Sequence, residues 1–261
     1  MNVVVNLLAN IGARTISMLV EAGKVSIFVS KGVWACCSWP LYIGELLKQM
    51  LNTGFFSIPI VGLTAVFSGM VIALQTYVGF AKFSGESAVA TVVIVAITRE
   101  LGPVMAGLMV AGRMSASIAA ELGSMKISEQ IDALEILGVN PFRFLVAPRI
   151  LACLICLPLL TLMADVIGVF GGFLVGTTKL GFASHAYMTQ TLMNLATEDV
   201  MCGLVKSACF GFTIAIFGCF YGFNSARGAK SVGEATTMAV VAACMGILVL
   251  NYVVTAMFFG V

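Results

Sequence analysis

Residues 98–141 decide the fold, and they read TRELGPVMAGLMVAGRMSASIAAELGSMKISEQIDALEILGVNP. This stretch places Arg99 and Glu100 inside apolar sequence, followed at once by Gly102 and Pro103. Charged side chains at membrane depth are costly, and they mark a functional site or a buried ion pair. Adjacent residues of a helix point about 100° apart, so Arg99 and Glu100 need not pair with each other, and each then needs a partner elsewhere or water. Pro103 removes a backbone donor and kinks the helix, which is typical of a position beside a cavity.

The composition is that of an integral membrane protein. Of the 261 residues, 60% are hydrophobic and 10% are charged, and the mean hydropathy is +1.07. A span needs about 20 mostly apolar residues. Five stretches meet this need: residues 54–80, a second that starts near residue 88, and residues 144–176, 200–223 and 235–259. We therefore predict an all-α membrane protein with five spans, forming a single domain over residues 1–261.

Residues 1–50 differ from the spans because charged side chains interrupt the apolar pattern. These charges are Arg14, Glu21, Lys24, Lys31, Glu45 and Lys48. Trp34 and Trp39 lie close together, as is typical of chain at headgroup depth. The pattern predicts N-terminal helices that lie in the membrane interface over residues 1–50, followed by the five-span bundle over residues 51–261.

Two further polar features lie inside the apolar sequence. Arg113, Ser117 and Glu121 are spaced four residues apart in a run of small residues, so one helical face offers a ladder of charges near the membrane boundary. A positive-inside anchor with its counter-charge is an equally good interpretation of that spacing. Asp165 is the only acid of the third predicted span, which is long enough to be tilted or to break at Pro158.

The acidic end of the opening stretch predicts a short helix with clear boundaries. Ser128 is the expected N-cap, Gly138 follows the last turn, and Pro141 stops the chain from continuing as a helix. Its two faces differ: Glu129, Asp132 and Glu135 cover one side, and Ile131, Leu134 and Leu137 cover the other. Such a helix between two spans either covers the bundle or presents a rigid handle to a soluble partner.

The positions of Lys and Arg predict the orientation in the membrane. With a cytoplasmic N-terminus and five spans, ten basic residues fall on the inner side: Arg14, Lys24, Lys31, Lys48, Arg113, Lys126, Arg143, Arg149, Arg227 and Lys230. Only Lys82 and Lys179 fall outside. Basic residues favour the cytoplasmic side, so we expect the N-terminus and the acidic helix in the cytoplasm and the C-terminus outside.

The sequence lacks the motifs of an enzyme. It contains no GxxxxGK[ST] phosphate loop, no HExxH and no GxSxG. Cys153 and Cys156 form a CxxC, but they lie in an apolar run without further ligands, where Cys behaves as a small hydrophobe. The net charge of +2 is dispersed and does not indicate nucleic acid. We expect no catalytic residue, no metal and no cofactor on this chain, which suits the membrane half of a transporter driven by another protein.

The sequence closely resembles the MlaE-type permeases of ABC transporters, which move phospholipids between the two membranes of Gram-negative bacteria. The matching run is RELGPVMAGLMVAGRMSASIAAELGSMKISEQIDALEILGVNP, continued by LVAPRILA and LPLL. The resemblance covers the chain from about Asn52 to the C-terminus. One departure is Ser115, where the family often has Gly. Membership implies a multi-pass protein of the bacterial inner membrane that forms a homodimer.

The resemblance also implies a lipid cavity between the first two spans, near the dimer axis and open to the periplasm. Its wall corresponds here to Ile72, Gln75, Tyr77, Val78, Arg99, Glu100 and Leu101. Lys206 matches a further charged position of the family.

The short acidic helix resembles the coupling helix that docks in a groove of the ATPase. The corresponding residues here are Glu129, Gln130, Asp132, Ala133, Leu134 and Gly138. The partners implied by the family are the ATPase, which binds the ATP, a periplasmic MCE-domain protein and often a cytoplasmic STAS-domain protein.

Two other functions remain as alternatives. An ion-coupled secondary transporter would use Arg99, Glu100 and Asp165 as a charged path, but the two halves of the chain show no paired repeat. A lipid-modifying enzyme would need a catalytic constellation that the sequence does not contain.

Overall fold

The computed structural model describes residues 2–38, 42–80, 86–226 and 228–260, and this part of the chain contains helices and no strands. The elements in order are α1 (Asn2–Cys37), α2 (Ile43–Thr53), η1 (Phe55–Ser57), α3 (Ile58–Phe80), α4 (Glu86–Ala96), η3 (Ile97–Leu101), α5 (Gly102–Val110), η4 (Ala111–Ser115), α6 (Ala116–Ile127), α7 (Gln130–Ile136), η5 (Phe142–Val146), α8 (Ala147–Thr178), α9 (Ser184–Met193), α10 (Thr197–Phe223) and α11 (Ala229–Phe259). Three of the short elements, η3, η4 and η5, are π-helical turns inside longer helices.

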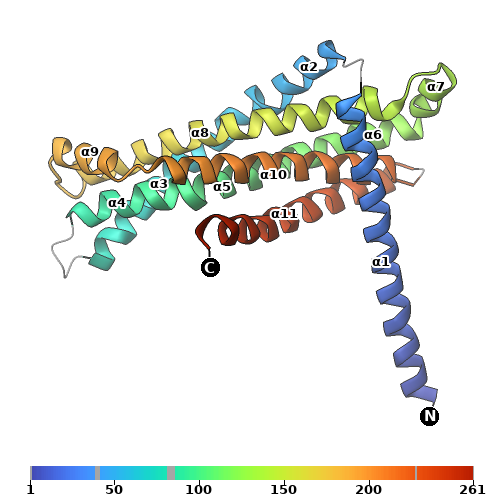
Figure 1. Cartoon of the computed structure of the whole chain (residues 1–261), viewed down its shortest axis with the longest axis horizontal. Helices are drawn as coiled ribbons and strands as arrows, with labels where there is room; N and C mark the ends of the chain where they lie inside the picture. Colours follow the sequence, from blue (N-terminus) through green and yellow to red (C-terminus); the bar gives the residue numbers. More distant parts are fainter. Residues whose placement is uncertain (1, 39–41, 81–85, 227, 261) are drawn as a thin grey trace.

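The described residues include five helical stretches that are long and apolar enough to cross a membrane, which confirms the predicted number of spans. Their bounds are Ile43–Phe80, Ala88–Ile127, Phe142–Thr178, Thr197–Phe223 and Ala229–Phe259. These stretches run side by side along the bundle (Figure 1). The first begins eleven residues before the expected position 54, because α2 continues through a single 3-10 turn into α3 despite the charges of Glu45 and Lys48. Pro158 lies inside α8 without ending it.

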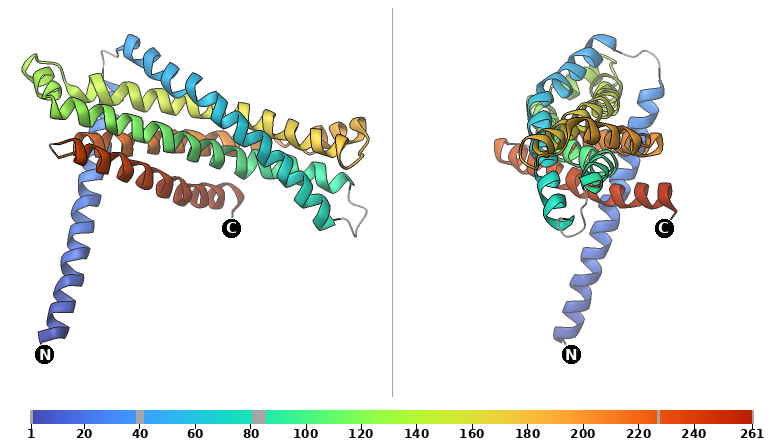
Figure 2. Two further views of the ribbon diagram at one scale, coloured as in Figure 1. Left: turned by 180° about the vertical axis from the view of Figure 1, so that it is seen from behind. Right: turned by 90° about the vertical axis from the view of Figure 1, so that its left-hand side faces the viewer.

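Helix α1 is arranged differently from the five span-length stretches. It crosses the bundle steeply near the end where α6 and α7 lie, and its N-terminal half extends away from the other helices in all views (Figures 1 and 2). Among the side chains of α1 that the structure describes, Phe28 and Ala35 in its C-terminal part are buried, whereas Ile16 and Leu19 are largely exposed. The ring of Phe28 lies 5.1 to 5.9 Å from the rings of Phe142, Phe220 and Phe223.

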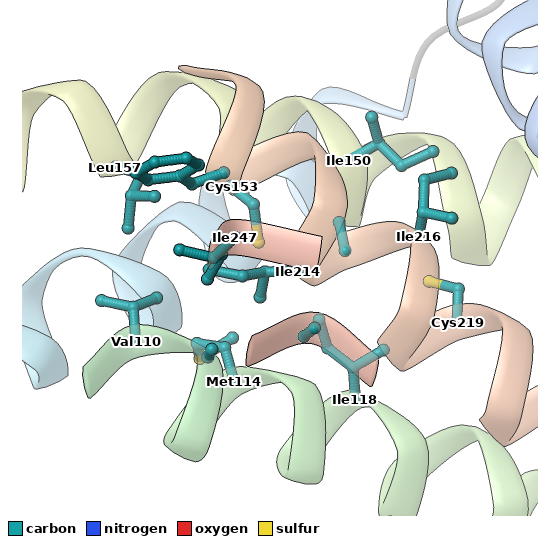
Figure 3. Packing of buried hydrophobic residues seen from close by; sticks show 14 of the residues in the cluster. Val110, Met114, Ile118, Ile150, Cys153, Leu157, Ile214, Ile216, Cys219 and Ile247 are labelled. Atoms are coloured by element: carbon teal, nitrogen blue, oxygen red, sulfur yellow. The ribbon is translucent and has the colours of Figure 1, made fainter. Parts of the chain in front are cut away.

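The core lies where α5, α6, α8, α10 and α11 meet (Figure 3). Side chains from these helices interdigitate there, and they include Val110, Met114, Ile118, Ile150, Cys153, Leu157, Ile214, Cys219 and Ile247. Ser115 fits this core because its buried hydroxyl donates to the Ile214 carbonyl at 3.3 Å. A second cluster packs α3 and α4 against α8 and α9, around Ala73, Val93 and Tyr187.

Glycine allows α3 and α8 to approach until their backbones touch. A Cβ placed on Gly69 would collide with the carbonyl of Gly168, and one on Gly171 would lie 2.5 Å from the Val66 carbonyl. Lipid offers no hydrophobic drive between helices, so close backbone packing of this kind holds membrane helices together. Gly79, at the end of α3, has open space around its Cα instead.

This contrast predicts opposite outcomes for two substitutions in one helix. Gly69→Ala forces α3 away from α8 and costs about 1–3 kcal/mol, the usual range for overpacking. Gly79→Ala adds a methyl group in open space and leaves stability unchanged or slightly improved. Thermal unfolding of the detergent-purified proteins measures both. Equal midpoints for the two variants would show that the α3–α8 contact is not close in the native protein.

Candidate functional site

A break in backbone hydrogen bonding organises the charged site of the second span. Pro103 has no N–H, so the carbonyl of Arg99 loses the donor that an α-helix would supply four residues later. The chain responds with a π-helical turn over Ile97–Leu101. The ammonium group of Lys206, on α10, donates to the Arg99 carbonyl at 2.9 Å. A side chain from another helix thus supplies a hydrogen bond that the backbone cannot make.

Glu100 is the counter-charge of that lysine. Lys206 Nζ lies 2.7 Å from Glu100 Oε1. Two polar residues of α11 also donate hydrogen bonds to this carboxylate: Asn251 Nδ2 donates to Oε2 at 2.9 Å, and Thr255 Oγ1 donates to Oε1 at 3.1 Å. Lys206 is fully buried, and a buried ammonium persists only with a close anion and further acceptors. The pair therefore ties the π-turn to α10 and α11 at one point.

Arg99 is held from two sides. Its Nε donates to Asp199 Oδ1 at 2.6 Å, and its guanidinium lies 4.4 Å from the centre of the Phe259 ring. Asp199 is buried in the first turn of α10, where the helix dipole also favours a carboxylate. The two terminal nitrogens of Arg99 have no hydrogen-bond partner among the described residues. Because 37% of the Arg99 side chain is exposed, these nitrogens are available to an external anion.

The four charges differ in their access to the surroundings. Lys206 and Asp199 have side chains that are 0% and 3% exposed, whereas those of Arg99 and Glu100 are 37% and 39% exposed. The two buried groups thus hold the two accessible ones in place. Of the two possibilities that the sequence left open for Arg99 and Glu100, water or a partner elsewhere, the structure shows a partner on α10 for each.

The residues predicted for the lipid cavity fall into two groups. Arg99, Glu100 and Lys206 come together in one cluster. Leu101 turns toward α3 and lines a small gap between α3, α5 and α8. The other four predicted residues lie in the C-terminal half of α3. Ile72 packs in the second cluster, Tyr77 contacts the Phe182 ring at 5.8 Å, and Gln75 and Val78 are exposed. None of the hydrogen bonds among described residues joins this α3 group to the charged cluster.

Three members of the charged cluster were not predicted: Asp199, Asn251 and Thr255. Asp199 precedes Lys206 by seven residues and shares its helical face, which is a signal that the sequence contains. Asn251 and Thr255 are four residues apart in an apolar span, the spacing of side chains on one face. Neither signal identifies which carboxylate the donors meet, because that depends on how α11 packs.

Asp165 stays apart from these ion pairs. The residue is 8% exposed, its Oδ1 has no hydrogen-bond partner among the described residues, and this oxygen lies against the Cα of Gly102. A Cβ at Gly102 would collide with that oxygen. Asp165 also borders an apolar cavity of about 450 Å³ between α8, α9 and the start of α10. The charged path of an ion-coupled transporter would have to bridge this separation.

The Arg113 ladder predicted from the sequence is wrong, because each of its charges turns to another helix. Arg113 donates to the Ser57 hydroxyl at 3.2 Å and to the Asn52 carbonyl. Glu121 pairs instead with Arg149 of α8, at 2.9 Å. Spacing within a helix shows only which residues share a face. Closer partners on α2, η1 and α8 decided the pairing.

The short acidic helix forms with one shifted boundary. It is α7, and its N-cap is Glu129 in the left-handed conformation (φ 56°), not Ser128. Ser128 ends α6, and its hydroxyl donates back to the Ser124 carbonyl at 2.9 Å. Gly138 follows the helix with φ 78°, as predicted, and the N–H of Val139 donates to the Leu134 carbonyl at 2.9 Å.

The faces of α7 agree only in part with the predicted pattern. Ile131 is buried and Leu134 is half-buried, so this side packs on the bundle. Leu137 was expected there, but it is 77% exposed, and neighbouring Ile136 is 86% exposed. The helix ends at Ile136, so the turn toward Gly138 rotates Leu137 away from the packed side. The exposed surface of α7 therefore combines acidic side chains with two large apolar ones.

The ion pair of the second span predicts a strong dependence between two substitutions. Lys206→Met leaves Glu100 without a cation and costs about 3–5 kcal/mol, as expected when one partner of a buried pair is removed. Adding Glu100→Gln removes the unpaired charge and restores more than half of that loss. Thermal unfolding of both single variants and of the double variant measures the coupling. Lys179→Met, at the exposed residue that follows α8, is the control. Simple additivity of the effects of Lys206→Met and Glu100→Gln would contradict the pairing.

The comparisons with known proteins agree with this architecture. The family model described as Permease MlaE matches residues 46–257. A probable ABC transporter permease protein of Rickettsia bellii is 50% identical over 256 residues, covering 98% of this chain and 99% of that protein. The intermembrane phospholipid transport system permease protein MlaE of Haemophilus influenzae is 31% identical over 258 residues, with 98% and 99% covered. The chloroplastic protein TRIGALACTOSYLDIACYLGLYCEROL 1 of Arabidopsis thaliana is 34% identical over 246 residues, with 94% and 68% covered. The chain therefore belongs to the MlaE family of ABC transporter permeases.

Proposed function

We propose that this permease moves phospholipids between the inner and outer membranes of a bacterium, driven by ATP that a separate ATPase subunit binds and hydrolyses. Family membership makes the chain the membrane subunit of a transporter and not a catalytic enzyme. The observation that carries the proposal is one uninterrupted helical stretch, Ala88–Ile127, which leads from the charged cluster to α7. The proposed lipid site and the helix that would contact the ATPase are thereby joined by one continuous stretch of chain.

The lipid end of this path is the exposed side of Arg99. A phosphodiester offers two anionic oxygens, and a guanidinium binds such a pair in bidentate fashion. The terminal nitrogens of Arg99 are held outward by Asp199 and Phe259, which suits that contact. Exposed residues of α3, including Gln75 and Val78, would line the apolar part of the same cavity. In this proposal two copies of the chain enclose the cavity, which opens to the periplasm.

The other end of the path is α7, which we assign as the coupling helix. Glu129, Gln130, Asp132 and Ala133 are exposed there, and Ile136 and Leu137 add exposed apolar surface beside them. A short helix of this composition fits a groove that has basic and apolar walls. Closure of the ATPase around ATP would press on α7, shift the second span and squeeze the lipid cavity.

The remaining partners follow from the proposed orientation. With the N-terminus and α7 in the cytoplasm, a STAS-domain protein and the ATPase approach from that side. The C-terminus and the lipid cavity face the periplasm, where an MCE-domain protein would receive or deliver the lipid. Helix α1 lies across the direction of the spans, which supports its placement along a membrane interface (Figure 1). In the proposed orientation this is the cytoplasmic interface.

Reversing charge on α7 tests the coupling. Glu129→Lys or Asp132→Lys should leave the protein in the membrane with its lipid bound, while lipid-stimulated ATP hydrolysis by the partner falls by about tenfold, equivalent to about 1.4 kcal/mol of docking free energy. Glu198→Lys, an exposed acid at the opposite end of the bundle, is the matched control. Reconstituted vesicles with the ATPase present allow both quantities to be measured. Normal transport by both variants would contradict the assignment of α7 as the coupling helix.

Changing Arg99 tests the lipid site. A hydrogen bond to a charged group contributes about 1.5–3 kcal/mol, so Arg99→Gln should lower the amount of copurified phospholipid by about tenfold or more. Arg99→Lys keeps the charge and should retain an intermediate amount. Lipid extraction followed by mass spectrometry gives the amounts. An unchanged amount of phospholipid in Arg99→Gln would contradict the proposed phosphate contact. Lipid uptake driven by an ion gradient without the ATPase would favour secondary transport instead.

A further inference from the structure

A cavity of about 720 Å³ lies where α1 contacts the C-terminal end of α10. The side chains of its lining that matter here are Glu21, Lys24, Phe217, Tyr221 and Asn224. Tyr221 follows Lys206 by fifteen residues on α10, a separation of about 22 Å at the rise of an α-helix. The cavity is therefore distinct from the charged cluster, and the proposed function does not use it.

Two opposite charges line this cavity from α1. Glu21 and Lys24 are three residues apart, so they occupy neighbouring positions on one helical face. Both side chains are exposed, and neither forms an ion pair or a hydrogen bond with another residue that the structure describes. Glu21 interacts electrostatically with the Tyr221 hydroxyl, so the carboxylate is close to α10. The α1 wall thus offers one cation and one anion.

Two neutral polar groups of α10 complete the lining. The amide nitrogen of Asn224 donates to the Phe220 carbonyl at 2.8 Å. Its Oδ1 has no partner in the described part of the chain, so it remains free as an acceptor. The Tyr221 hydroxyl makes no hydrogen bond to any described residue, so it remains a donor. The cavity therefore combines two donors, Lys24 and Tyr221, with two acceptors, Glu21 and Asn224.

Packing of aromatic rings sets the spacing of the two walls. Phe28 lies on the same face of α1 as Glu21, seven residues further on, and it is buried. The centre of its ring is 5.6 Å from that of Phe220, and the Phe220 ring is 5.3 Å from the Tyr221 ring. The polar groups of α1 and α10 are thus held at the two sides of one cavity by rings that pack in the core.

The cavity lies at the depth where a lipid headgroup meets its acyl chains. The span-length stretches run along the bundle and α1 lies across it, so a bundle that crosses the membrane places α1 along the membrane surface (Figures 1 and 2). Because α10 ends at Phe223, Phe217 lies deeper in the membrane than Tyr221. These two rings stack with their centres 6.5 Å apart. The charged groups are therefore at headgroup depth, and Phe217 offers apolar surface below them.

The donors and acceptors select among headgroups. A phosphate is bound by a cation and a hydroxyl, which Lys24 and Tyr221 supply. The two acceptors, Glu21 and Asn224, require N–H donors, which a primary ammonium has and a trimethylammonium lacks. An anionic headgroup without an ammonium would instead bring like charge against Glu21. The lining is thus complementary to a zwitterion with a phosphate and a primary ammonium, which is the headgroup of phosphatidylethanolamine.

We propose that this cavity binds the headgroup of a phosphatidylethanolamine molecule of the surrounding leaflet, as a site separate from that of the transported lipid. The phosphate would contact Lys24 and Tyr221, and the ammonium would contact Glu21 and Asn224. The bound headgroup would bridge α1 and α10 and so hold α1 along the membrane surface. The inference requires only that the chain spans a membrane, and it does not depend on the proposed substrate or partners.

The test uses the full chain in nanodiscs of phosphatidylcholine, alone or with phosphatidylethanolamine. For the wild type, phosphatidylethanolamine should raise the thermal unfolding midpoint, and native mass spectrometry should find it retained. Glu21→Gln with Lys24→Gln should remove most of that increase and lower the retained amount by about tenfold, because hydrogen bonds to charged groups are lost. Lys230→Gln with Glu234→Gln removes an exposed acid and base at the start of α11, so it is the matched control and should respond as the wild type does.

A single substitution tests the choice of headgroup. Glu21→Gln, on an exposed helix surface, removes the acid and leaves Lys24, so the cavity becomes cationic. The response of this variant to phosphatidylethanolamine should fall, and its response to phosphatidylglycerol should rise above that of the wild type. The same thermal unfolding and mass spectrometry measurements report both changes.

Two further measurements distinguish this site from the transport site and from a site for a soluble ligand. Arg99→Gln should keep the full response to phosphatidylethanolamine, because Arg99 lies elsewhere in the bundle. Glycerophosphoethanolamine, which has the headgroup without the chains, should give no comparable shift in detergent; a comparable shift would assign the cavity to a soluble ligand and overturn the proposal. The proposal is also overturned if the double variant responds as its control does, or if Glu21→Gln leaves the preference between the two lipids unchanged.

Discussion

The structure depends on keeping one lysine charged at membrane depth. Lys206 has no exposed surface, and its ammonium group contacts the Arg99 carbonyl and the Glu100 carboxylate of the second span. The Asn251 amide of α11 donates in turn to the Glu100 carboxylate. The carbonyl is open to it because Pro103 has no N–H. A proline that would merely weaken a soluble helix thus creates the acceptor that the buried charge requires, and three helices become fixed to one another.

Close backbone packing gives the same region its rigidity. Gly69 and Gly171 bring α3 and α8 into backbone contact, and Gly203 of α10 lies against the Thr98 carbonyl. Side chains here have little freedom to rearrange independently, because Lys206, Glu100 and Asp199 are paired and the helices pack closely at the glycines. The second span would therefore move as a unit, which is what transmission between the proposed lipid cavity and the proposed coupling helix needs.

Much of this could be predicted from the sequence. The five spans follow from apolar length, and helix geometry indicates that Arg99 and Glu100 need not pair with each other. What could not be predicted is the choice of partner. Arg113 and Glu121 share a face, yet they bind Ser57 and Arg149, because those groups lie nearer once the helices pack. The N-cap at Glu129 was missed for a related reason: Ser128 is a good cap in isolation, but its hydroxyl is used to finish α6.

The continuity of the second helical stretch also fixes an angular relation. Residues 104–127 contain no break between Pro103 and the turn at Ser128, apart from the π-turn at Ala111–Ser115. Each residue of a helix adds about 100° of rotation and 1.5 Å of rise. Together with the π-helical turns over Ile97–Leu101 and Ala111–Ser115, this rotation sets the direction of α7 relative to that of Arg99. An insertion or a deletion between Arg99 and α7 would rotate one relative to the other, so the number of residues that separates them is itself constrained by the fold.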